Sequence, residues 1–392
     1  MKKLKKEYDF IIGGAGIVGS AIALELKQKF RDKSVLLLEK ENIPGYHQTG
    51  HNSGVIHSGI YYKPNSLKSN NCLEGYRYLI EFCRNYKIPY EIGGKIIASR
   101  NINEEETLST LYLRSKEVGL NGVRLLDSKK EINKIEPYLN VSKGLFVPHT
   151  GVVNYKKVCE KMISIFEELG GEYLSNTTIR SKTKNSIETN NGNFGFQKLI
   201  LALGIQSDRI VSTDYHIIPF RGEYFQLHKK LNNLVKSMVY PVPDLNYPFL
   251  GLHFTKGIDQ NIEIGPNALL AFAREKYNSK YDFNARDFID LITNKNLFSF
   301  VIENKEFAKQ EALRSIFKGR MTNDIQSYFP QVTCKDFYFT RSGIRAQLMD
   351  SKGALVDDFI INNNDNCLHI LNAPSPAATS SISIAKYIIK LI

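Results

Sequence analysis

The sequence has no tryptophan, few cysteines and no long uninterrupted apolar stretch. The longest candidate, Phe10 to Leu24, contains four glycines and is followed by Glu25, so it is too short to span a bilayer. Glu7 and Asp9 separate this stretch from the basic residues before it, which argues against a secretory signal. The cysteines form no C-x-x-C pair, and their odd number and wide spacing exclude a disulfide framework and a zinc site: Cys72, Cys83, Cys159, Cys334 and Cys367. These absences predict a cytoplasmic protein.

Acidic residues are fewer than basic ones, since 40 Asp and Glu against 52 Lys and Arg leave a formal charge of +12. The lysines are spread through every region, and only Lys2, Lys3, Lys5 and Lys6 form a compact basic run. Nucleic-acid-binding proteins usually concentrate such charge on one element, so no nucleic-acid partner is expected. Attraction to an anionic membrane surface or to an acidic small substrate stays open. The length of 392 residues and the 42% hydrophobic content predict a globular protein of two or three domains.

A glycine-rich segment near the amino terminus lies between a predicted strand and a predicted helix. Tyr8 to Ile12 is a β-branched and aromatic run, and Ser20 to Phe30 has helical apolar periodicity. Between them, Gly14-Ala15-Gly16-Ile17-Val18-Gly19 has the spacing G-x-G-x-x-G. The first glycine allows a tight turn, the second the close approach of a pyrophosphate, and the third close packing of the helix on the strand.

A second predicted strand, Ser34 to Leu38, ends at Glu39, twenty residues after Gly19. An acid at this distance can accept hydrogen bonds from an adenosine ribose. The free N–H groups and the positive dipole end of the preceding helix suit the phosphates. The combination predicts a dinucleotide site, and a glycine-rich structural turn is the alternative.

The loop from Pro44 to Gly59 consists mainly of small and hydrogen-bonding residues. A nicotinamide-binding domain would usually continue here with another helix and strand, whereas such a loop can run against a flat ligand. Its three histidines do not predict a metal site, because no carboxylate or cysteine cluster accompanies them. The loop therefore favours a flavin.

The later part of the chain contains two more predicted strands. Lys198 to Gly204 is an apolar run of the buried type that can return to the dinucleotide-binding sheet, although by itself it is only a core strand. Cys367 to Leu371 is followed by helical periodicity from Ser380 to Ile392. We expect Ser375 to be the N-cap of this helix and Pro376 its first residue. A helix pointing at a flavin would stabilise its reduced form, and an ordinary terminal helix is the alternative.

From Tyr8 to the final helix, the chain resembles the L-2-hydroxyglutarate oxidases and dehydrogenases of the D-amino-acid-oxidase-like flavoprotein superfamily. Seven blocks carry the resemblance: His47-Gln48-Thr49-Gly50-His51-Asn52-Ser53-Gly54-Val55-Ile56-His57, Gly59-Ile60-Tyr61-Tyr62-Lys63-Pro64, Ser66-Leu67-Lys68, Pro219-Phe220-Arg221-Gly222-Glu223-Tyr224-Phe225, Gly265-Pro266-Asn267-Ala268, Gly343-Ile344-Arg345-Ala346-Gln347 and Asn372-Ala373-Pro374-Ser375-Pro376-Ala377-Ala378-Thr379-Ser380. Arg341-Ser342 departs from the pattern, because less polar residues are expected before Gly343. The stretch from Tyr281 to Pro330 matches only loosely.

The resemblance implies an α/β fold with a Rossmann-like FAD-binding domain of the glutathione-reductase type and a discontinuous substrate domain built on an antiparallel sheet. The FAD-binding domain is expected in 1–88, 150–215 and 340–392, with a crossover helix near Asn154 to Leu169. The substrate domain is expected in 89–149 and 216–339, with strands near 90–99, 216–228, 249–255 and 261–265. The cofactor is expected to be FAD, contacted by Gly14, Ala15, Gly16, Ile17, Val18, Gly19, Glu39, Lys40, Thr49, His51, Asn52, Ser53, Gly54, Ala202, Gly204, Arg345, Pro374, Ser375, Pro376 and Ala377.

The resemblance also implies oxidation of L-2-hydroxyglutarate to 2-oxoglutarate. A hydride passes from C2 to flavin N5 while the hydroxyl proton passes to a base that is neutral near pH 7, and histidine suits this role. His57 and His253 are the expected base candidates, with the choice between them open. His51 is expected to order the loop.

A dicarboxylate substrate requires cations, and the planar guanidinium of arginine binds a carboxylate with two hydrogen bonds. Arg221 and Arg345 are therefore the expected carboxylate clamps. Lys63, Lys95 and Lys256 are secondary candidates, and Tyr62 and Tyr224 are expected hydrogen-bond donors to the substrate, although buried tyrosines also serve the backbone in this way.

The expected electron acceptor is a quinone-type compound or oxygen. A quinone would bring peripheral contact with the inner membrane, for which the run from Lys2 to Lys6 is a candidate. Two alternatives stay open. One is a flavoenzyme that acts on another 2-hydroxy acid or an amino acid, and the other is a non-catalytic dinucleotide-binding or RNA-associated module, favoured only by the charge.

Overall fold

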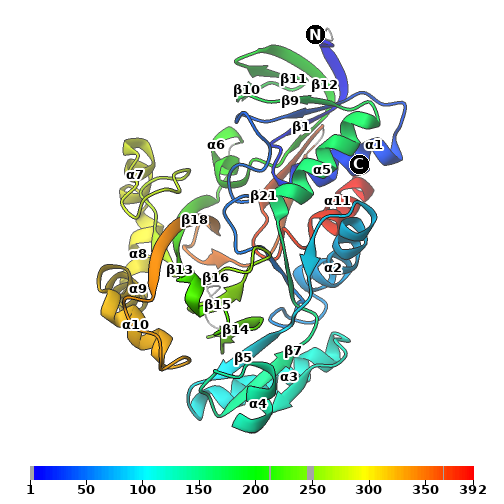
Figure 1. The fold of residues 1–392 in the computed structure, drawn as a ribbon. Coiled ribbons are helices and arrows are strands. Elements are labelled where there is room, and N and C mark those ends of the chain that lie inside the picture. The colour runs from blue at the N-terminus through cyan, green and yellow to red at the C-terminus, as the bar shows by residue number, and fades with distance from the viewer. Residues whose placement is uncertain (1–3, 212, 245–250, 365) are drawn as a thin grey trace.

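The computed structural model describes residues 4–211, 213–244, 251–364 and 366–392, which form two large sheets, one in the upper and one in the lower half of Figure 1. The strands of the upper, eight-stranded sheet are β1 (Glu7–Gly13), β2 (Val35–Leu38), β9 (Glu172–Leu174), β10 (Ile179–Lys182), β11 (Ser186–Thr189), β12 (Gly192–Leu201), β20 (Ile360–Asn364) and β21 (Cys367–Asn372). Its centre is parallel in the order β9-β2-β1-β12-β21. The strands β10, β11 and β20 extend it with antiparallel pairs.

The central strands of the upper sheet are buried on both faces. Four helices cover one face with a shared apolar core: α1 (Ile17–Lys29), α2 (Leu67–Asn85), α5 (Tyr155–Glu168) and α11 (Ser381–Lys390). On the opposite face, Ile11, Leu36 and Leu199 pack against Ile187 of the β10–β11 hairpin. Burial on both faces explains why these strands are continuous apolar runs in the sequence.

The lower sheet has ten strands: β5 (Lys95–Ser99), β6 (Arg124–Leu126), β7 (Lys143–Val147), β13 (His216–Leu227), β14 (Met238–Pro241), β15 (His253–Lys256), β16 (Ile262–Gly265), β17 (Leu269–Leu270), β18 (Phe337–Met349) and β19 (Leu355–Val356). They follow the order β19-β18-β13-β16-β15-β14-β5-β7-β6, with β17 beside β13. The sheet is mixed and not purely antiparallel as expected, because β14 and β5 run parallel.

Smaller elements surround the two sheets. A three-stranded sheet joins β3 (Val55–Ile56), β8 (Gly151–Val153) and β4 (Tyr90–Glu91). The remaining helices are α3 (Asn103–Glu117), α4 (Lys129–Ile135), α6 (Ser207–Ile210), α7 (Ala285–Ile292), α8 (Lys295–Glu303), α9 (Lys305–Ile316), α10 (Lys318–Gln326), η1 (Gly204–Gln206) and η2 (Lys229–Leu231). The helices α7 to α10 flank the lower sheet on one side, and α3 and α4 lie at its lower end (Figure 1). Among the described residues, no helix is long and apolar enough to cross a membrane.

The expected elements β1, α1, β2, α5, β12, β13, β16 and β21 are confirmed. The expected run 90–99 is split into β4 and β5, and part of the expected strand 249–255 lies outside the described residues. The expected helix start is wrong, because α11 begins at Ser381 and residues 375–380 form turns. The side chain of Ser375 contacts His57 and caps no helix, and the first helical hydrogen bond runs from Ile384 N–H to the carbonyl of Ser380.

The division into domains stays a prediction, with one structural consequence at its last boundary. Residue 340 lies inside β18, which pairs with β13 along its whole length and so belongs to the lower sheet. A division that follows the sheets would place this boundary after β19, because β20 and β21 belong to the upper sheet.

Candidate active site

The glycine loop between β1 and α1 has the close packing that its sequence predicts. Gly14 has φ +95°, and a Cβ atom there would lie 2.4 Å from the carbonyl oxygen of Ala202. A Cβ atom on Gly19 would lie 1.9 Å from the carbonyl oxygen of Gly14. Neither position accepts a larger residue, because the turn, the helix and the end of β12 meet at these two glycines.

The N-terminus of α1 is prepared for an anion. Its N-cap is Gly16, which has no capping side chain, and the first turn contains no acidic residue. A Cβ atom on Gly16 would meet only Thr49 Oγ1 within 4 Å among the described residues, so the space beside this glycine is open. Thr49 belongs to the following loop and accepts a hydrogen bond from Ile17 N–H at 3.0 Å. The open space and the positive dipole end fit a pyrophosphate.

Glu39 follows β2 and is buried beside the glycine loop. Its carboxylate accepts hydrogen bonds from Ala15 N–H at 2.9 Å and from Glu41 N–H at 3.0 Å. Burial raises the pKa of Glu39, and the two backbone donors act in the opposite direction. A carboxylate held in this way next to the phosphate end can accept hydrogen bonds from ribose hydroxyls.

The loop that follows Glu39 is held by its own side chains. Asn52 Nδ2 donates to the carbonyl oxygens of Gln48 and Thr49, and its Oδ1 accepts from Gly54 N–H at 2.8 Å. The partly buried Ser53 lies within this turn. The ring of His51 stacks on Tyr277 with 3.8 Å between the ring centroids. His51 Nδ1 also lies 3.0 Å from the carbonyl oxygen of His47, and these contacts are consistent with the expected ordering role, which stays a prediction.

Two distant segments of the chain meet this loop. A Cβ atom on Gly204, which has φ +55°, would lie 2.8 Å from Gln48 Oε1. The turn from Pro374 to Ala377 is closed by Ala377 N–H donating to the carbonyl of Pro374 at 2.9 Å. Its Ser375 reaches His57, which follows β3, with 3.3 Å between Oγ and Nε2. The glycine cradle, the acid and these segments fit FAD in chemistry and in order along the chain.

The lower sheet has one apolar and one polar face, because side chains alternate along each strand. Phe225, Ile264, Phe254, Val239 and Ile96 are paired across five strands and belong to one apolar cluster, together with side chains of α10. The residues next to four of them point to the other, mainly polar face: Lys95, Tyr240, His253 and Tyr224. The adjacent strand β18 adds Arg341, paired with Tyr224, and Arg345, paired with Phe220, to this face. This second face approaches the loop from Pro44 to Gly59, because a Cβ atom on Gly343 would lie 2.4 Å from the carbonyl oxygen of His51.

The two base candidates come together at this face from different parts of the chain. Burial and the charges of Lys95, His253 and Lys68 lower the pKa of His57 to about 3. Burial and the charges of Arg345 and Lys95 lower the pKa of His253 to about 4, and the hydrogen bond to the carbonyl of Gly251 acts in the opposite direction. Both rings are therefore neutral near pH 7.

The hydrogen bonds of His253 define its tautomer. Nδ1 lies 2.9 Å from the carbonyl oxygen of Gly251, which can only accept, so Nδ1 carries the proton. Nε2 of the neutral ring is then unprotonated and able to accept a proton. The ring is stacked on Tyr240 with 4.1 Å between the ring centroids, which holds its orientation.

The two expected arginine clamps lie on opposite faces of the sheet. Arg345 pairs with Phe220 of β13 and shares its face with Tyr224, and its Nη1 donates to the carbonyl of Asn267 at 2.9 Å. Arg221 lies on the other face, where Nη2 donates to the buried Glu223 at 3.1 Å and Nη1 to the carbonyl of Lys280. The structure therefore brings Arg345 to the face that carries His253 and places Arg221 on the opposite face.

The other expected substrate residues are also divided. Tyr62 is partly buried near Ser375, with the ammonium of Lys68 at 4.9 Å from its ring centroid. The buried Tyr224 lies on the polar face. Lys63 is exposed, and Lys256 is the last residue of β15 with a partly exposed side chain. The contacts of Tyr62 and the position of Tyr224 on the polar face therefore keep both as candidates for substrate binding. The exposure of Lys63 gives no support to such a role.

Arg341 and Tyr240 are polar-face residues that sequence reasoning missed. The guanidinium of Arg341 lies 4.0 Å from the ring centroid of Tyr224, pairs with Glu263 at 2.7 Å and donates to the carbonyl of Asn52 at 3.0 Å. Arg341 therefore joins the loop from Pro44 to Gly59 to the lower sheet. The available signal was the departure at Arg341 itself, a charged residue where a less polar one was expected.

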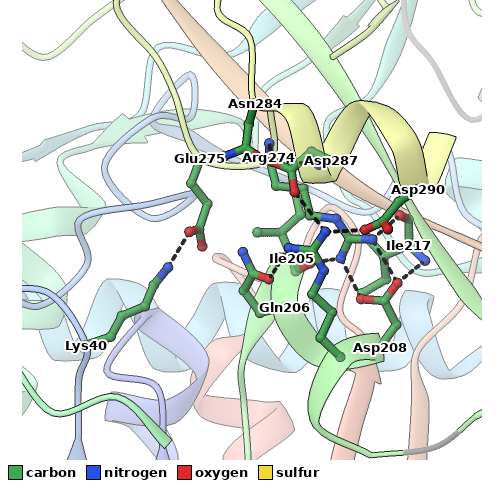
Figure 2. Close-up of polar contacts among 11 residues, drawn as sticks. Lys40, Ile205, Gln206, Asp208, Ile217, Arg274, Glu275, Asn284, Asp287 and Asp290 are labelled. Atoms are coloured by element: carbon green, nitrogen blue, oxygen red, sulfur yellow. Dashed lines mark hydrogen bonds and ion pairs between the residues drawn. The ribbon is translucent and has the colours of Figure 1, made fainter. Parts of the chain in front are cut away.

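A polar network joins the segment after β17 to the upper unit (Figure 2). The buried guanidinium of Arg274 donates to both carboxylate oxygens of Asp208 at 2.6 and 3.0 Å, and Arg209 pairs with Asp287 at 2.8 Å. Glu275 pairs with Lys40, the residue after Glu39 (Figure 2). Lys40, an expected FAD contact, is thus directed to Glu275, and the network joins the segment after β17 to η1, α6 and the residue after Glu39.

Comparison with known proteins shows the family to which the chain belongs. A family model described as FAD dependent oxidoreductase (DAO) matches residues 9–391. The chain is 41% identical over 388 residues to the L-2-hydroxyglutarate dehydrogenase of Indibacter alkaliphilus, covering 96% of this chain and 97% of the relative. It is 39% identical over 404 residues to the mitochondrial L-2-hydroxyglutarate dehydrogenase of Homo sapiens, covering 96% and 87%.

Among solved structures, the chain is similar to the dithionite-reduced L-α-glycerophosphate oxidase from Mycoplasma pneumoniae with FAD bound. The TM-score is 0.79 at 22% sequence identity, and the match covers 99% of this chain and 95% of the other. At this identity the likeness shows the fold alone.

Proposed function

Because the chain belongs to the DAO family of FAD-dependent oxidoreductases, we propose that its substrate is L-2-hydroxyglutarate, which it oxidises to 2-oxoglutarate. The observation that carries this proposal is the polar face of the lower sheet. There His253 lies in the field of two cations, Lys95 and Arg345, which come from different strands. A dicarboxylate with a hydroxyl group between its two charges is complementary to a base between two cations.

The residues that hold FAD in this proposal follow the order of the cofactor's parts. Glu39 binds the ribose, the loop from Gly14 to Gly19 and the N-terminus of α1 bind the pyrophosphate, and the segments 49–54 and 374–377 line the flavin. Bound FAD supplies the two-electron acceptor that takes the C2 hydrogen as hydride.

The proton of the substrate hydroxyl passes to His57 or His253. Both imidazoles are neutral at pH 7, so both can accept it, and only His253 has a tautomer defined by a carbonyl partner. Burial, and after it the neighbouring cations, keep the pKa of each ring low while the site holds no anion. A bound dianion compensates these cations and raises the pKa of the base toward the range in which proton transfer is most effective.

Arg345 binds a carboxylate of the substrate in this proposal. Its hydrogen bond to the carbonyl of Asn267 orients the guanidinium, and Tyr224 lies beside it on the same face. The opposite orientation of Arg221 supports a structural role for that residue, as the partner of Glu223.

Anaerobic mixing of the FAD-loaded protein with each enantiomer of 2-hydroxyglutarate tests the substrate. The L form is expected to bleach the visible flavin band and the D form to leave it unchanged. An oxidised spectrum that persists with the L form would contradict the assignment. Bleaching by another 2-hydroxy acid or by an amino acid would then identify the substrate class.

The reduced flavin must pass its electrons to an acceptor, for which a quinone-type compound or oxygen is our proposal. Large exposed apolar side chains on α7 and α8 support peripheral contact with a membrane, where a quinone resides: Ile289, Ile292, Phe298 and Ile302. Lys5 and Lys6 of the basic run are exposed, whereas Lys2 and Lys3 lie outside the described residues.

Binding to anionic liposomes tests this contact. Deleting residues 2–6 should weaken binding, and unchanged binding would remove the basic run from the proposal. Replacing Ile289 and Phe298 by serine tests the apolar surface independently of the basic run. The measurement is the fraction of protein that stays in solution when the liposomes are sedimented.

A further inference from the structure

Lys95 is a buried lysine without an acidic partner. Its side chain lies on β5 with an exposed fraction of 1%, and its ammonium lies 4.1 Å from the ring centroid of Tyr61 and 4.9 Å from that of Tyr240. Among the described residues, Nζ takes part in no hydrogen bond or ion pair. Aromatic faces attract a cation, but they do not replace the hydrogen bonds that it loses with water.

The Tyr61 ring beside this ammonium carries a second donor without a partner. The hydroxyl of Tyr61 is buried and has no hydrogen-bond partner among the described residues. Buried donors are nearly always hydrogen-bonded, so an unpaired cation and an unpaired hydroxyl on the ring that it contacts require an explanation. A carboxylate supplies it, because its oxygens can accept from both groups and its charge balances the ammonium.

The position of Lys95 fits one end of a dicarboxylate. In the order of strands, β5 lies on one side of β15, which carries His253, and β18, which carries Arg345, lies on the other. All three side chains share the polar face, and both cations act on His253. The two cations therefore act on the histidine from the same face and from opposite sides along the sheet, and Lys95 is the cation whose ammonium has no partner among the described residues.

We propose that Lys95 and Tyr61 form a subsite for one carboxylate of the substrate, while Arg345 binds the other. This inference rests on the proposed function for the identity of the substrate. It adds a specificity subsite in which the ligand is a carboxylate and the protein groups are an ammonium and a phenol.

The test uses glutarate, a dicarboxylate without a hydroxyl group, titrated into the FAD-loaded full chain while the flavin spectrum is recorded. Lys95→Met is expected to raise the glutarate dissociation constant about 10- to 100-fold at pH 6, the size of a lost charge-assisted hydrogen bond. Tyr61→Phe keeps the ring beside the ammonium but removes the hydroxyl, and should raise the glutarate dissociation constant about fivefold. Lys143→Met removes an exposed charge from the neighbouring strand β7 and should leave it unchanged.

Melting temperature and FAD content show whether each variant is folded. A glutarate dissociation constant within threefold of wild type in folded Lys95→Met would overturn the proposal. If that variant does not fold, Tyr61→Phe decides, because wild-type affinity there would exclude the paired subsite.

The pH dependence gives an independent readout. Burial lowers the pKa of Lys95 to about 7, so its ammonium is lost between pH 6 and 9, and the wild-type glutarate dissociation constant should rise about tenfold per pH unit above 7. The other groups that face Lys95 do not titrate in this window: His57 at about 3, His253 at about 4, Cys72 at about 12, and Tyr61 and Tyr240 with pKa values raised by burial. This rise of the glutarate dissociation constant with pH should be absent in Lys95→Met. A wild-type dissociation constant that does not change between pH 6 and 9 would contradict the proposal.

Failure of the subsite and failure of the proposed function are distinguishable. Wild-type protein that binds glutarate through Lys95 but is not reduced by L-2-hydroxyglutarate would keep the subsite and change the substrate. Reduction by L-2-hydroxyglutarate with unchanged glutarate binding in both variants would keep the function and remove the subsite.

Discussion

Replacing Lys95 by methionine is expected to make the protein more stable while it weakens the binding site. Methionine has a similar length and no charge, so it occupies the space between Tyr61 and Tyr240 without an ammonium that must lose its water. Replacement of a buried charge by an apolar side chain of similar volume often stabilises a fold. A residue retained for the sake of structure would show the opposite effect.

The size of the effect follows from the pKa of Lys95, which burial lowers from 10.5 to about 7. One pKa unit corresponds to about 1.4 kcal/mol, so the buried ammonium lowers the free energy of unfolding by roughly 4 to 5 kcal/mol at and below pH 7. The penalty decreases as the pH rises from 7 toward 10.5, because folding then releases a proton that the unfolded chain still binds. About 2 kcal/mol of it remains at pH 9.

Methionine loses the contacts between the ammonium and the two rings, so the net gain expected at pH 7 is about 2 to 4 kcal/mol. For a chain of 392 residues that unfolds as a unit, this corresponds to a rise in Tm of about 2 to 5 °C. The assay is thermal unfolding of both proteins at pH 6, 7, 9 and 10, with the same excess of FAD, because bound ligand itself raises Tm.

The difference in Tm between variant and wild type should be largest at pH 6 to 7 and shrink at pH 9 to 10. The control Lys143→Met breaks an exposed ion pair with Glu105 and should change the free energy of unfolding by less than about 1 kcal/mol. A lower Tm for Lys95→Met at pH 7 with normal FAD content, or a difference that does not vary with pH, would refute the reasoning.

Five further substitutions, in three groups, test the site and its support. His57→Ala and His253→Ala are compared by stopped-flow flavin reduction at pH 7, where loss of the base should slow the reaction about 100- to 10,000-fold and wild-type rates in both would remove both candidates. Arg345→Met should raise the dissociation constant of the substrate about 10- to 100-fold in a titration. Arg221→Met should chiefly lower Tm in a thermal melt, because Glu223 loses its guanidinium partner. Weaker substrate binding in Arg221→Met together with a lower Tm and normal binding in Arg345→Met would contradict their placement. Asp208→Asn leaves a buried guanidinium without its counter-charge and should lower the free energy of unfolding by about 3 kcal/mol, so an unchanged Tm would show that this pair does not hold the units together.

The dinucleotide end of the molecule could be predicted from the sequence because its determinants are local. The turn at Gly14, the packing at Gly19 and the acid after β2 all lie within one short βαβ unit, where spacing along the chain determines position in space. The loop with His51 and Asn52 is similar, since its hydrogen bonds join residues only two to four apart. The adjacent residue Lys40 is different, because its partner Glu275 is supplied by a distant segment.

The substrate side could be predicted only in part, because it depends on pairing between distant strands. Arg221 and Arg345 lie in equally convincing sequence blocks, and only the register of β13 with β18 shows that they face opposite sides. The register also decides that Arg341 meets Tyr224. Ser375 satisfied every local rule for an N-cap, yet its hydroxyl lies beside His57, a contact across 318 positions that no local rule contains.

The charges on the polar face bear on the choice between a hydroxy acid and an amino acid. An amino acid carries an ammonium group on the carbon that is oxidised, so binding would bring a further positive charge close to the base. Burial and the charges of Arg345 and Lys95 already lower the pKa of His253. Burial and the charges of Lys95 and Lys68 lower that of His57. A cationic group would lower these pKa values further and would itself be repelled.

A dianionic hydroxy acid has the opposite effect at the same residues. Its hydroxyl is neutral, and its two carboxylates compensate the cations that otherwise keep the histidines from binding a proton. Substrate binding and activation of the base are then coupled, since the charges that hold the substrate add to burial in lowering the pKa of the base in its absence. It follows that removing Lys95 should weaken binding and at the same time raise the pKa of both histidines in the free protein, which NMR titration of the imidazoles would detect. Unchanged histidine titration in folded Lys95→Met would separate the two effects and refute this coupling.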